Sequence, residues 1–195
     1  KDWEYVVKLD GDLEFKADYF EKLFERFEAN PKLGMASGKT FVPENGKLTM
    51  EPCTDDHVRG PSKVYKRQCF EEIGGLPETL GWDTIDELKA QLKGWETRSY
   101  KDLVILHLRR MSYQHKDWSR GRLKFGRGSY FLGYHPLFIL AKGFYRIFDK
   151  PYFIGGIAVI LGYFDSMIKR EPQYPEKEVI KHLRKKQLKR LFSVG

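Results

Sequence analysis

Strand-forming and helix-forming segments alternate along the first 110 residues, and this alternation constrains the fold more than any other feature of the sequence. Residues 4–9 are rich in β-formers and stop at an Asp-Gly-Asp turn. Apolar side chains at helical spacing follow at 20–27, and a second apolar helical face lies within 85–92. Further strands are expected at 33–42, 47–50, 62–65, 96–100 and 103–108. The pattern predicts an α/β domain whose mixed sheet has flanking helices.

The character of the sequence changes near Tyr113, where strand signals stop and aromatic and glycine residues gather. Residues 129–168 hold two apolar stretches broken by charges, and the longer uninterrupted run, 152–164, has thirteen residues. A helix that spans a bilayer needs roughly 20, so we expect buried or interfacial helices here and a basic helix over 176–192. The sequence therefore predicts an α/β domain over 1–112 and a helical, aromatic and basic extension over 113–195 that contacts a membrane surface.

The hydrophobic content, net charge and cysteine number of the sequence limit the classes of protein that it can belong to. Hydrophobic residues make up 41% of the 195 residues and aromatic residues 15%, which is enough for a core and excludes wholesale disorder. The net charge of +8 suits nucleic acid, anionic lipid and phosphorylated ligands alike. Cys53 and Cys69 are too few for a disulfide framework, which indicates reduced thiols in a cytosolic protein. Because a strand begins at once and the first residue is not Met, we expect an upstream piece.

The turn after the first strand, Asp10-Gly11-Asp12, is the first candidate for chemistry. In open α/β sheets, ligands bind beyond the carboxyl ends of the strands. Two carboxylates there can hold a hard divalent cation, which in turn can grip a diphosphate. The triplet is also an ordinary turn sequence, because Asp and Gly are turn formers. A calcium loop of the EF-hand type is excluded, since it needs glycine at its sixth position, where Phe15 stands.

The start of the helix expected after Gly81 is the second candidate. Thr84 followed three residues later by Glu87 is a capping-box pattern, and an acidic Asp86 in the first turn suits the helix dipole. These structural roles explain the residues without catalysis. The functional interpretation is that Asp86 acts as a general base toward a sugar acceptor while Trp82 stacks on a sugar ring.

A third candidate lies at the end of the last expected strand, where alternation puts His107 and Arg109 on one face. Imidazole can complete a metal site, and arginine can pair with phosphate. A strand-end histidine beside a solvated arginine explains the same residues equally well. The basic and aromatic segments 115–120 and 124–127 suit phosphates, lipid headgroups or nucleic acid, and equally an ordinary solvated face.

In their order along the chain, these elements resemble family 2 glycosyltransferases, which have the GT-A fold. The resemblance covers about residues 1–110 and rests on Asp10-Gly11-Asp12, Gly74-Gly75-Leu76, Gly81-Trp82 and Thr84-Ile85-Asp86. It implies a partial GT-A-like, Rossmann-like sheet followed by the helical extension.

The resemblance also implies roles for particular residues. Asp12 would hold a divalent metal, Mn²⁺ or Mg²⁺, and Asp10 would assist it or contact the donor ribose. Asp86 would be the catalytic base, and His107 a further metal ligand. Substrate binding would fall to Trp82, Gly75, Asp83 and Arg109.

Two departures from the family pattern are visible. Ile85 stands where the family often has Glu before the base, although Asp86 itself is kept. The family's nucleotide-binding strands precede the acidic motif, and this sequence lacks them. We therefore expect these 195 residues to be inactive as a fragment on their own.

The function predicted from the sequence is metal-dependent, inverting transfer of a sugar from a nucleotide-sugar donor to a hydroxyl of a saccharide or lipid-linked acceptor, in the synthesis of cell-envelope polysaccharide. We expect the protein in the cytoplasm at the inner face of the cell membrane, with no nucleic-acid partner. Two alternatives stay open. One is a nucleotidyltransferase that makes the sugar nucleotide, and the other is a non-enzymatic module that binds an anionic surface or nucleic acid.

Overall fold

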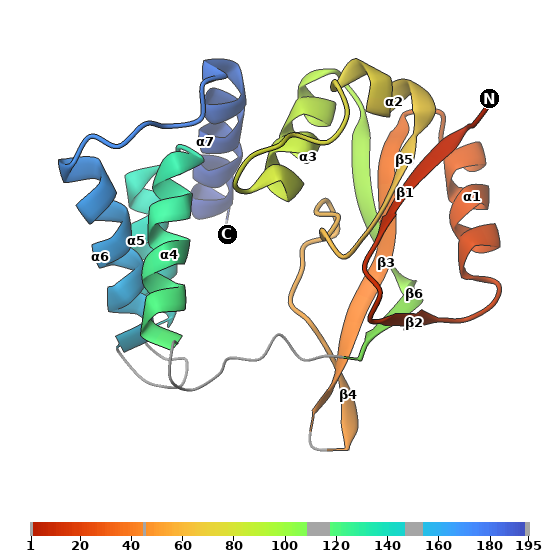
Figure 1. Ribbon diagram of the computed structural model, residues 1–195, viewed down its shortest axis with the longest axis horizontal. Coiled ribbons are helices and arrows are strands. Elements are labelled where there is room, and N and C mark those ends of the chain that lie inside the picture. Colours follow the sequence, from red (N-terminus) through yellow and green to blue (C-terminus); the bar gives the residue numbers. More distant parts are fainter. Residues whose placement is uncertain (1, 45, 109–117, 147–153, 194–195) are drawn as a thin grey trace. The chain divides into compact units, whose positions relative to one another are not determined.

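The computed structural model describes residues 2–44, 46–108, 118–146 and 154–193 (Figure 1). The chain divides into two compact units, Lys1–Ser112 and Tyr113–Gly195. Each unit has its own secondary structure, with sheet and helices in the first and helices in the second.

The first unit is built on a six-stranded sheet of order β1-β5-β3-β6-β2, with β4 paired to β3. Its strands are β1 (Tyr5–Leu9), β2 (Leu13–Phe15), β3 (Leu33–Glu44), β4 (Lys47–Met50), β5 (Ser62–Lys66) and β6 (Glu96–His107). Its helices are α1 (Tyr19–Ala29), α2 (Arg67–Glu72) and α3 (Trp82–Leu92). Strands β3 and β6 pair in parallel and the other pairs are antiparallel, which confirms the predicted α/β class with a mixed sheet.

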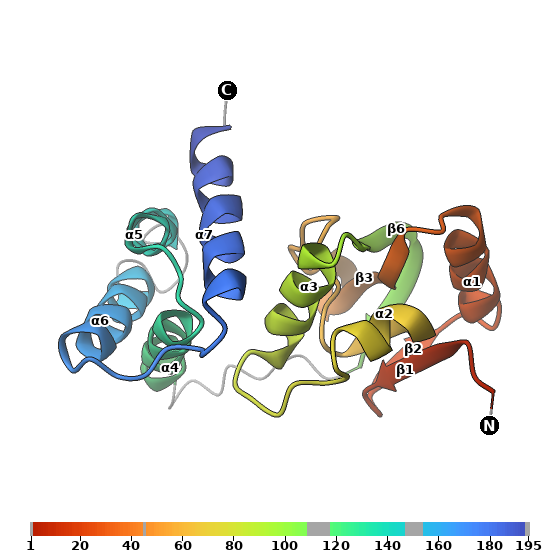
Figure 2. The same cartoon turned by 90° about the horizontal axis from the view of Figure 1, so that it is seen from above.

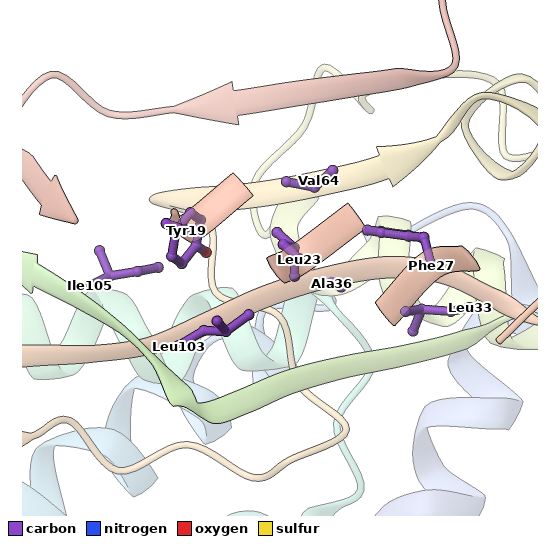
Figure 3. Packing of buried hydrophobic residues seen from close by; sticks show 8 residues of the cluster. All are labelled: Tyr19, Leu23, Phe27, Leu33, Ala36, Val64, Leu103 and Ile105. Carbon is purple, nitrogen blue, oxygen red and sulfur yellow. The ribbon is translucent and has the colours of Figure 1, made fainter. Parts of the chain in front are cut away.

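Helices cover both faces of this sheet (Figure 2). Successive strand residues point to opposite faces, and accordingly Val64 packs in the α1 layer while its neighbour Tyr65 packs in the layer of α2 and α3. The α1 core (Figure 3) consists of Tyr19, Leu23, Phe27, Leu33, Ala36, Val64, Leu103 and Ile105. Each large apolar side chain buried in this way contributes about 1.5–3 kcal/mol, so the two layers fix the sheet whose end carries the candidate site.

The second unit contains four helices within the described residues: α4 (Trp118–Phe131), α5 (Pro136–Tyr145), α6 (Ile154–Ile168) and α7 (Lys177–Phe192). Helices α4 and α6 approach closely at two glycines. A Cβ added at Gly126 would lie 2.2 Å from the Val159 carbonyl oxygen, and one at Gly162 would lie 2.3 Å from the Leu123 carbonyl oxygen. The helical extension is therefore confirmed, and in the part of the chain that the structure describes no helix is both long and apolar enough to cross a membrane.

Candidate functional site

Three separate segments meet at the end of β1. The backbone N–H of Asp10 donates to the Pro61 carbonyl oxygen over 2.9 Å, which ties the acidic turn to the loop before β5. Lys8 pairs with the Asp10 carboxylate, and its Nζ lies 5.5 Å from the centroid of the Trp82 ring. The sheet therefore brings the acidic turn and the first residue of α3 to the same end.

The start of α3 is set by Gly81, whose φ of +73° lies in the left-handed region that favours glycine. The backbone N–H groups of Thr84 and Ile85 donate to the Gly81 carbonyl oxygen, so helical bonding begins there. The predicted capping box is wrong, because the helix begins at Trp82 and no side chain caps it. Its first turn carries the half-buried acidic residue Asp83.

Asp83 packs against the loop that precedes β5. A Cβ placed on Gly60 would lie 3.3 Å from Asp83 Oδ2, so a side chain at this position would require the Asp83 carboxylate to shift by a few tenths of an ångström, whereas its 3.5 Å approach to Trp82 Cζ2 is ordinary contact. Lys63 Nζ donates to the Asp83 carbonyl oxygen and lies 5.5 Å from the Trp82 ring centroid. The Asp83 carboxylate therefore lies beside Gly60, and the next residue, Pro61, is bonded to Asp10 of the acidic turn.

Asp86, unlike the half-buried Asp83, is fully buried, with 0% of its surface exposed. Its two carboxylate oxygens accept bonds from Lys63 Nζ at 2.8 and 3.0 Å, from the Tyr65 hydroxyl at 2.6 Å and from the Glu87 backbone N–H at 2.7 Å. Burial raises the pKa of the Asp86 carboxyl group, and the bonds from Lys63 and Tyr65 oppose that rise. The expectation that Asp86 faces an acceptor is not met here, because the carboxylate is enclosed and its oxygens are already bonded.

Glu87 extends this buried network to the loop before β5. Its carboxylate accepts from the Val58 backbone N–H at 2.5 Å and pairs with His57 Nδ1 at 2.8 Å, and Lys63 Nζ lies 3.5 Å away. A charge removed from water in this way is tolerated only when it is paired and hydrogen-bonded. The acidic side chains of α3 beyond its first turn therefore hold α3, β5 and the loop together.

Pairing of β2 with β6 brings two of the predicted metal ligands into contact. Leu13 lies opposite His107, and the Leu108 backbone N–H donates to the Asp12 carbonyl oxygen. His107 Nε2 is consequently 3.5 Å from Asp12 Oδ2. The other ring nitrogen, Nδ1, is buried and has no hydrogen-bond partner among the described residues.

The third predicted ligand, Asp10, is turned toward Lys8 instead. Within the described ranges, no group of three or more His, Cys, Asp or Glu side chains is close enough to hold a metal ion. Asp12 and His107 nevertheless fit a divalent ion such as Mn²⁺, since carboxylate oxygen and imidazole nitrogen are both among its ligands. Further coordination would come from substrate oxygens or water.

Of the other predicted site residues, Gly75 is not brought into this group. Gly75 has a φ of +76°, and its backbone N–H donates to the Phe70 carbonyl oxygen just after α2 ends, so the structure explains this glycine by the turn it makes. Arg109 lies outside the described residues, as does the segment from His115 to Asp117. The sequence interpretation missed Lys63, Tyr65 and Gly60, which carry no pattern that separates them from ordinary strand and loop residues.

The fold defines the class, an α/β protein with a mixed sheet and flanking helices. Comparison with known protein families finds no match. Among solved structures, the chain is similar to the mannosyltransferase PcManGT from Pyrobaculum calidifontis, in complex with GDP-Man and Mn²⁺, with 14% sequence identity and a TM-score of 0.46. The match covers 98% of this chain and 63% of that chain, so this chain spans less than two thirds of that protein's length. A likeness at this level carries no argument about function, which rests on the site residues.

Proposed function

We propose that the chain is part of a glycosyltransferase that moves a sugar from a nucleotide-sugar donor to an acceptor hydroxyl, with a divalent metal and inversion at the anomeric carbon. One observation carries the proposal. The acidic turn after β1 lies at the same end of the sheet as the first turn of α3: Lys8 contacts both Asp10 and Trp82, and the Gly60-Pro61 segment contacts both Asp10 and the half-buried Asp83. A metal-held diphosphate and a proton acceptor are the two groups that such a transfer requires.

Asp12 and His107 would hold the metal, with Asp10 beside them to contact the donor. When bound, the ion neutralises negative charge that develops on the departing nucleoside diphosphate. Trp82 offers an aromatic face for a sugar ring, next to Lys8 and Lys63. These residues bind and orient the donor and acceptor.

The proton acceptor in this proposal is Asp83 rather than Asp86. The acceptor oxygen attacks the anomeric carbon, the bond from that carbon to the diphosphate oxygen breaks, and the hydroxyl proton passes to the Asp83 carboxylate. Asp83 is only half-buried, whereas Asp86 is enclosed with its oxygens bonded to Lys63, Tyr65 and the Glu87 backbone N–H. An enclosed carboxylate cannot reach a hydroxyl of a bound sugar without breaking that network.

The test is a set of variants in the full-length protein, assayed for transfer and for thermal stability. Asp83→Asn should lower the transfer rate by about 10²–10⁴-fold, the range for loss of a general base, at an unchanged melting temperature. Glu78→Gln, an exposed change in the loop before α3, is the matched control and should alter neither. Full transfer activity in Asp83→Asn would remove Asp83 from the mechanism, and an inactive Asp86→Asn variant that stays stable would return the role to Asp86.

Donor and metal are tested in the same full-length protein by thermal shift with a panel of nucleoside diphosphates, with and without Mn²⁺. The proposal expects stabilisation by one or more nucleotides that depends on the metal, because a ligand bound only by the folded state raises its stability. Asp12→Asn should abolish the metal dependence. Release of pyrophosphate from a nucleoside triphosphate and a sugar phosphate would favour the nucleotidyltransferase alternative instead.

A further inference from the structure

Helices α5 and α6 each expose a stripe of large apolar side chains. On α5 these are Leu137, Leu140 and Phe144, and on α6 they are Ile154, Ile157 and Leu161. Both sets have the spacing i, i+3, i+7, which places them on one side of a helix. The six side chains are between 41% and 64% exposed, so the packing of the second unit leaves a large part of each stripe accessible.

The two helices run antiparallel. Gly143, near the end of α5, is close to Gly156, near the start of α6, since a Cβ on Gly143 would lie 3.2 Å from the Gly156 carbonyl oxygen. Just before α5 begins, the Tyr134 carbonyl oxygen accepts a 2.6 Å bond from the hydroxyl of Tyr163, in the second half of α6. The end of α5 therefore lies next to the start of α6, and the start of α5 lies next to the second half of α6.

The contact between the helices fixes where the stripes point. Gly143 faces the Ile160 side chain, because an added Cβ would be 2.5 Å from it. Leu140 and Phe144 lie three residues before and one residue after Gly143, and Ile157 and Leu161 have the same offsets from Ile160. At about 100° per residue, the stripes are rotated from the contact line by roughly 60–100° in the same sense. In an antiparallel pair, equal rotations turn both stripes to one side, so they form a single surface, the α5–α6 apolar face.

The net charge of the second unit indicates which class of partner binds this face. From residue 113 onward, the sequence holds 17 Lys and Arg against 6 Asp and Glu, a net +11, while the first 112 residues hold 18 against 21, a net −3. A second copy of this chain would bring another +11 to the same contact. An anionic bilayer instead complements the charge and accepts apolar side chains, and a basic unit with one apolar surface is typical of interfacial binding.

We propose that the α5–α6 apolar face lies in the interfacial region of an anionic lipid bilayer, with Leu137, Leu140, Phe144, Ile157 and Leu161 inserted among the acyl chains. Neither helix spans the membrane, because α5 has 10 residues and α6 has 15, against the roughly 20 that a spanning helix needs. The α5–α6 apolar face therefore enters one leaflet of the bilayer and does not cross it. It does not depend on the proposed transfer reaction, since it uses residues of the second unit alone.

The experiment is co-flotation of the protein with vesicles of phosphatidylcholine alone or of phosphatidylcholine with phosphatidylglycerol. The wild-type protein should bind the anionic vesicles at least about tenfold more tightly than the neutral ones, and less tightly at high salt. The double variant Leu140→Gln/Ile157→Gln changes no charge and should bind the anionic vesicles on the order of 30-fold more weakly. Leu48→Gln/Leu80→Gln, which alters two apolar residues of the first unit that are at least as exposed, is the matched control and should bind as wild type does.

Three results would overturn the proposal. One is the absence of wild-type binding to anionic vesicles, and another is equal binding by the Leu140→Gln/Ile157→Gln variant and the wild type. The third is a dimer in sedimentation velocity that this variant dissociates, which would assign the face to a second copy. Circular dichroism of the variant should match the wild type, because both substituted side chains are exposed and their loss leaves the helix packing in place.

Discussion

The buried ion pair of Lys63 and Asp86 should contribute strongly to the free energy of unfolding of the first unit. The substitution Asp86→Asn tests this contribution. The variant keeps the size of the side chain but leaves the Lys63 ammonium, which is 0% exposed, without its partner at 2.8 Å. Removing one member of a buried pair costs about 3–5 kcal/mol. Because Glu87 Oε1 stays 3.5 Å from Lys63 Nζ, we expect the lower end of this range, about 3 kcal/mol.

That loss is large for a unit of this size. For a domain of about 100 residues, 1 kcal/mol moves the melting temperature by roughly 4–8 °C, so a loss of about 3 kcal/mol in Asp86→Asn should lower it by about 12–24 °C. Tyr65→Phe, which removes the 2.6 Å bond to Asp86, should cost about 1.5–3 kcal/mol, the range for a hydrogen bond to a charged group.

The assay is urea unfolding followed by tryptophan fluorescence, which reports mainly on the first unit because three of the four tryptophans, Trp3, Trp82 and Trp95, lie there. A double-mutant cycle with Lys63→Met separates the pair from its surroundings. Lys63→Met/Asp86→Asn should lose at least about 2 kcal/mol less than the sum of the two single losses, because the double variant leaves no unpaired charge at this position. Additive losses, or an Asp86→Asn variant as stable as wild type, would refute the reasoning.

Further predictions concern both units. Gly126→Ala should destabilise the second unit by about 1–3 kcal/mol in thermal unfolding, because its methyl group would meet the Val159 carbonyl oxygen, whereas Gly121→Ala in the same helix has no atom within 4 Å and should stabilise by about 0.5–1 kcal/mol. Burial, with Arg190 and Arg122 nearby, lowers the pKa of Lys142 to about 8. The folded state therefore disfavours the charged lysine, so the free energy of unfolding should rise between about pH 8 and pH 10.5, a rise that Lys142→Met should remove in urea titrations at each pH. Burial raises the pKa of the Cys69 thiol to about 12, so iodoacetamide followed by mass spectrometry should find Cys53 modified first and Cys69 protected until the protein unfolds.

Much of the fold could be predicted because its signals are local. The strand that ends at Leu9, the helix with Leu23 and Phe27 on one face, and the basic C-terminal helix follow from periodicity and turn residues, and the structure confirms each. Strand β2 was not predicted, because three residues are too few for a periodic signal. The position of helix α4 within the predicted helical extension could not be read from the sequence, since its glycines argue against a helix locally, and only the close approach of α6 explains Gly126.

The candidate site was predictable in its residue types but not in its burial. The acidic turn at Asp10 and Asp12 is read directly from the sequence, and so is an acidic helix start after Gly81. Which acid of that helix is enclosed depends on Lys63, a residue 23 positions away from Asp86 whose strand lies under α3. A lysine buried in a strand has no sequence signature of its own, because elsewhere the same residue type is solvated. Because this pairing is long-range, the burial of Asp86 could not be predicted from the sequence.

The pairing of β2 with β6 sets the order in which the protein can be completed during synthesis. Leu13 is made about 90 residues before its partner His107, and at roughly 5–20 residues per second a ribosome takes about 5–18 s to cover that interval. Throughout this time Asp12 has no imidazole beside it, since the sheet closes only when its last strand has emerged. A nascent or truncated chain that stops before His107 thus carries the acidic turn without its imidazole partner, and the Asp12–His107 contact exists only in the finished sheet.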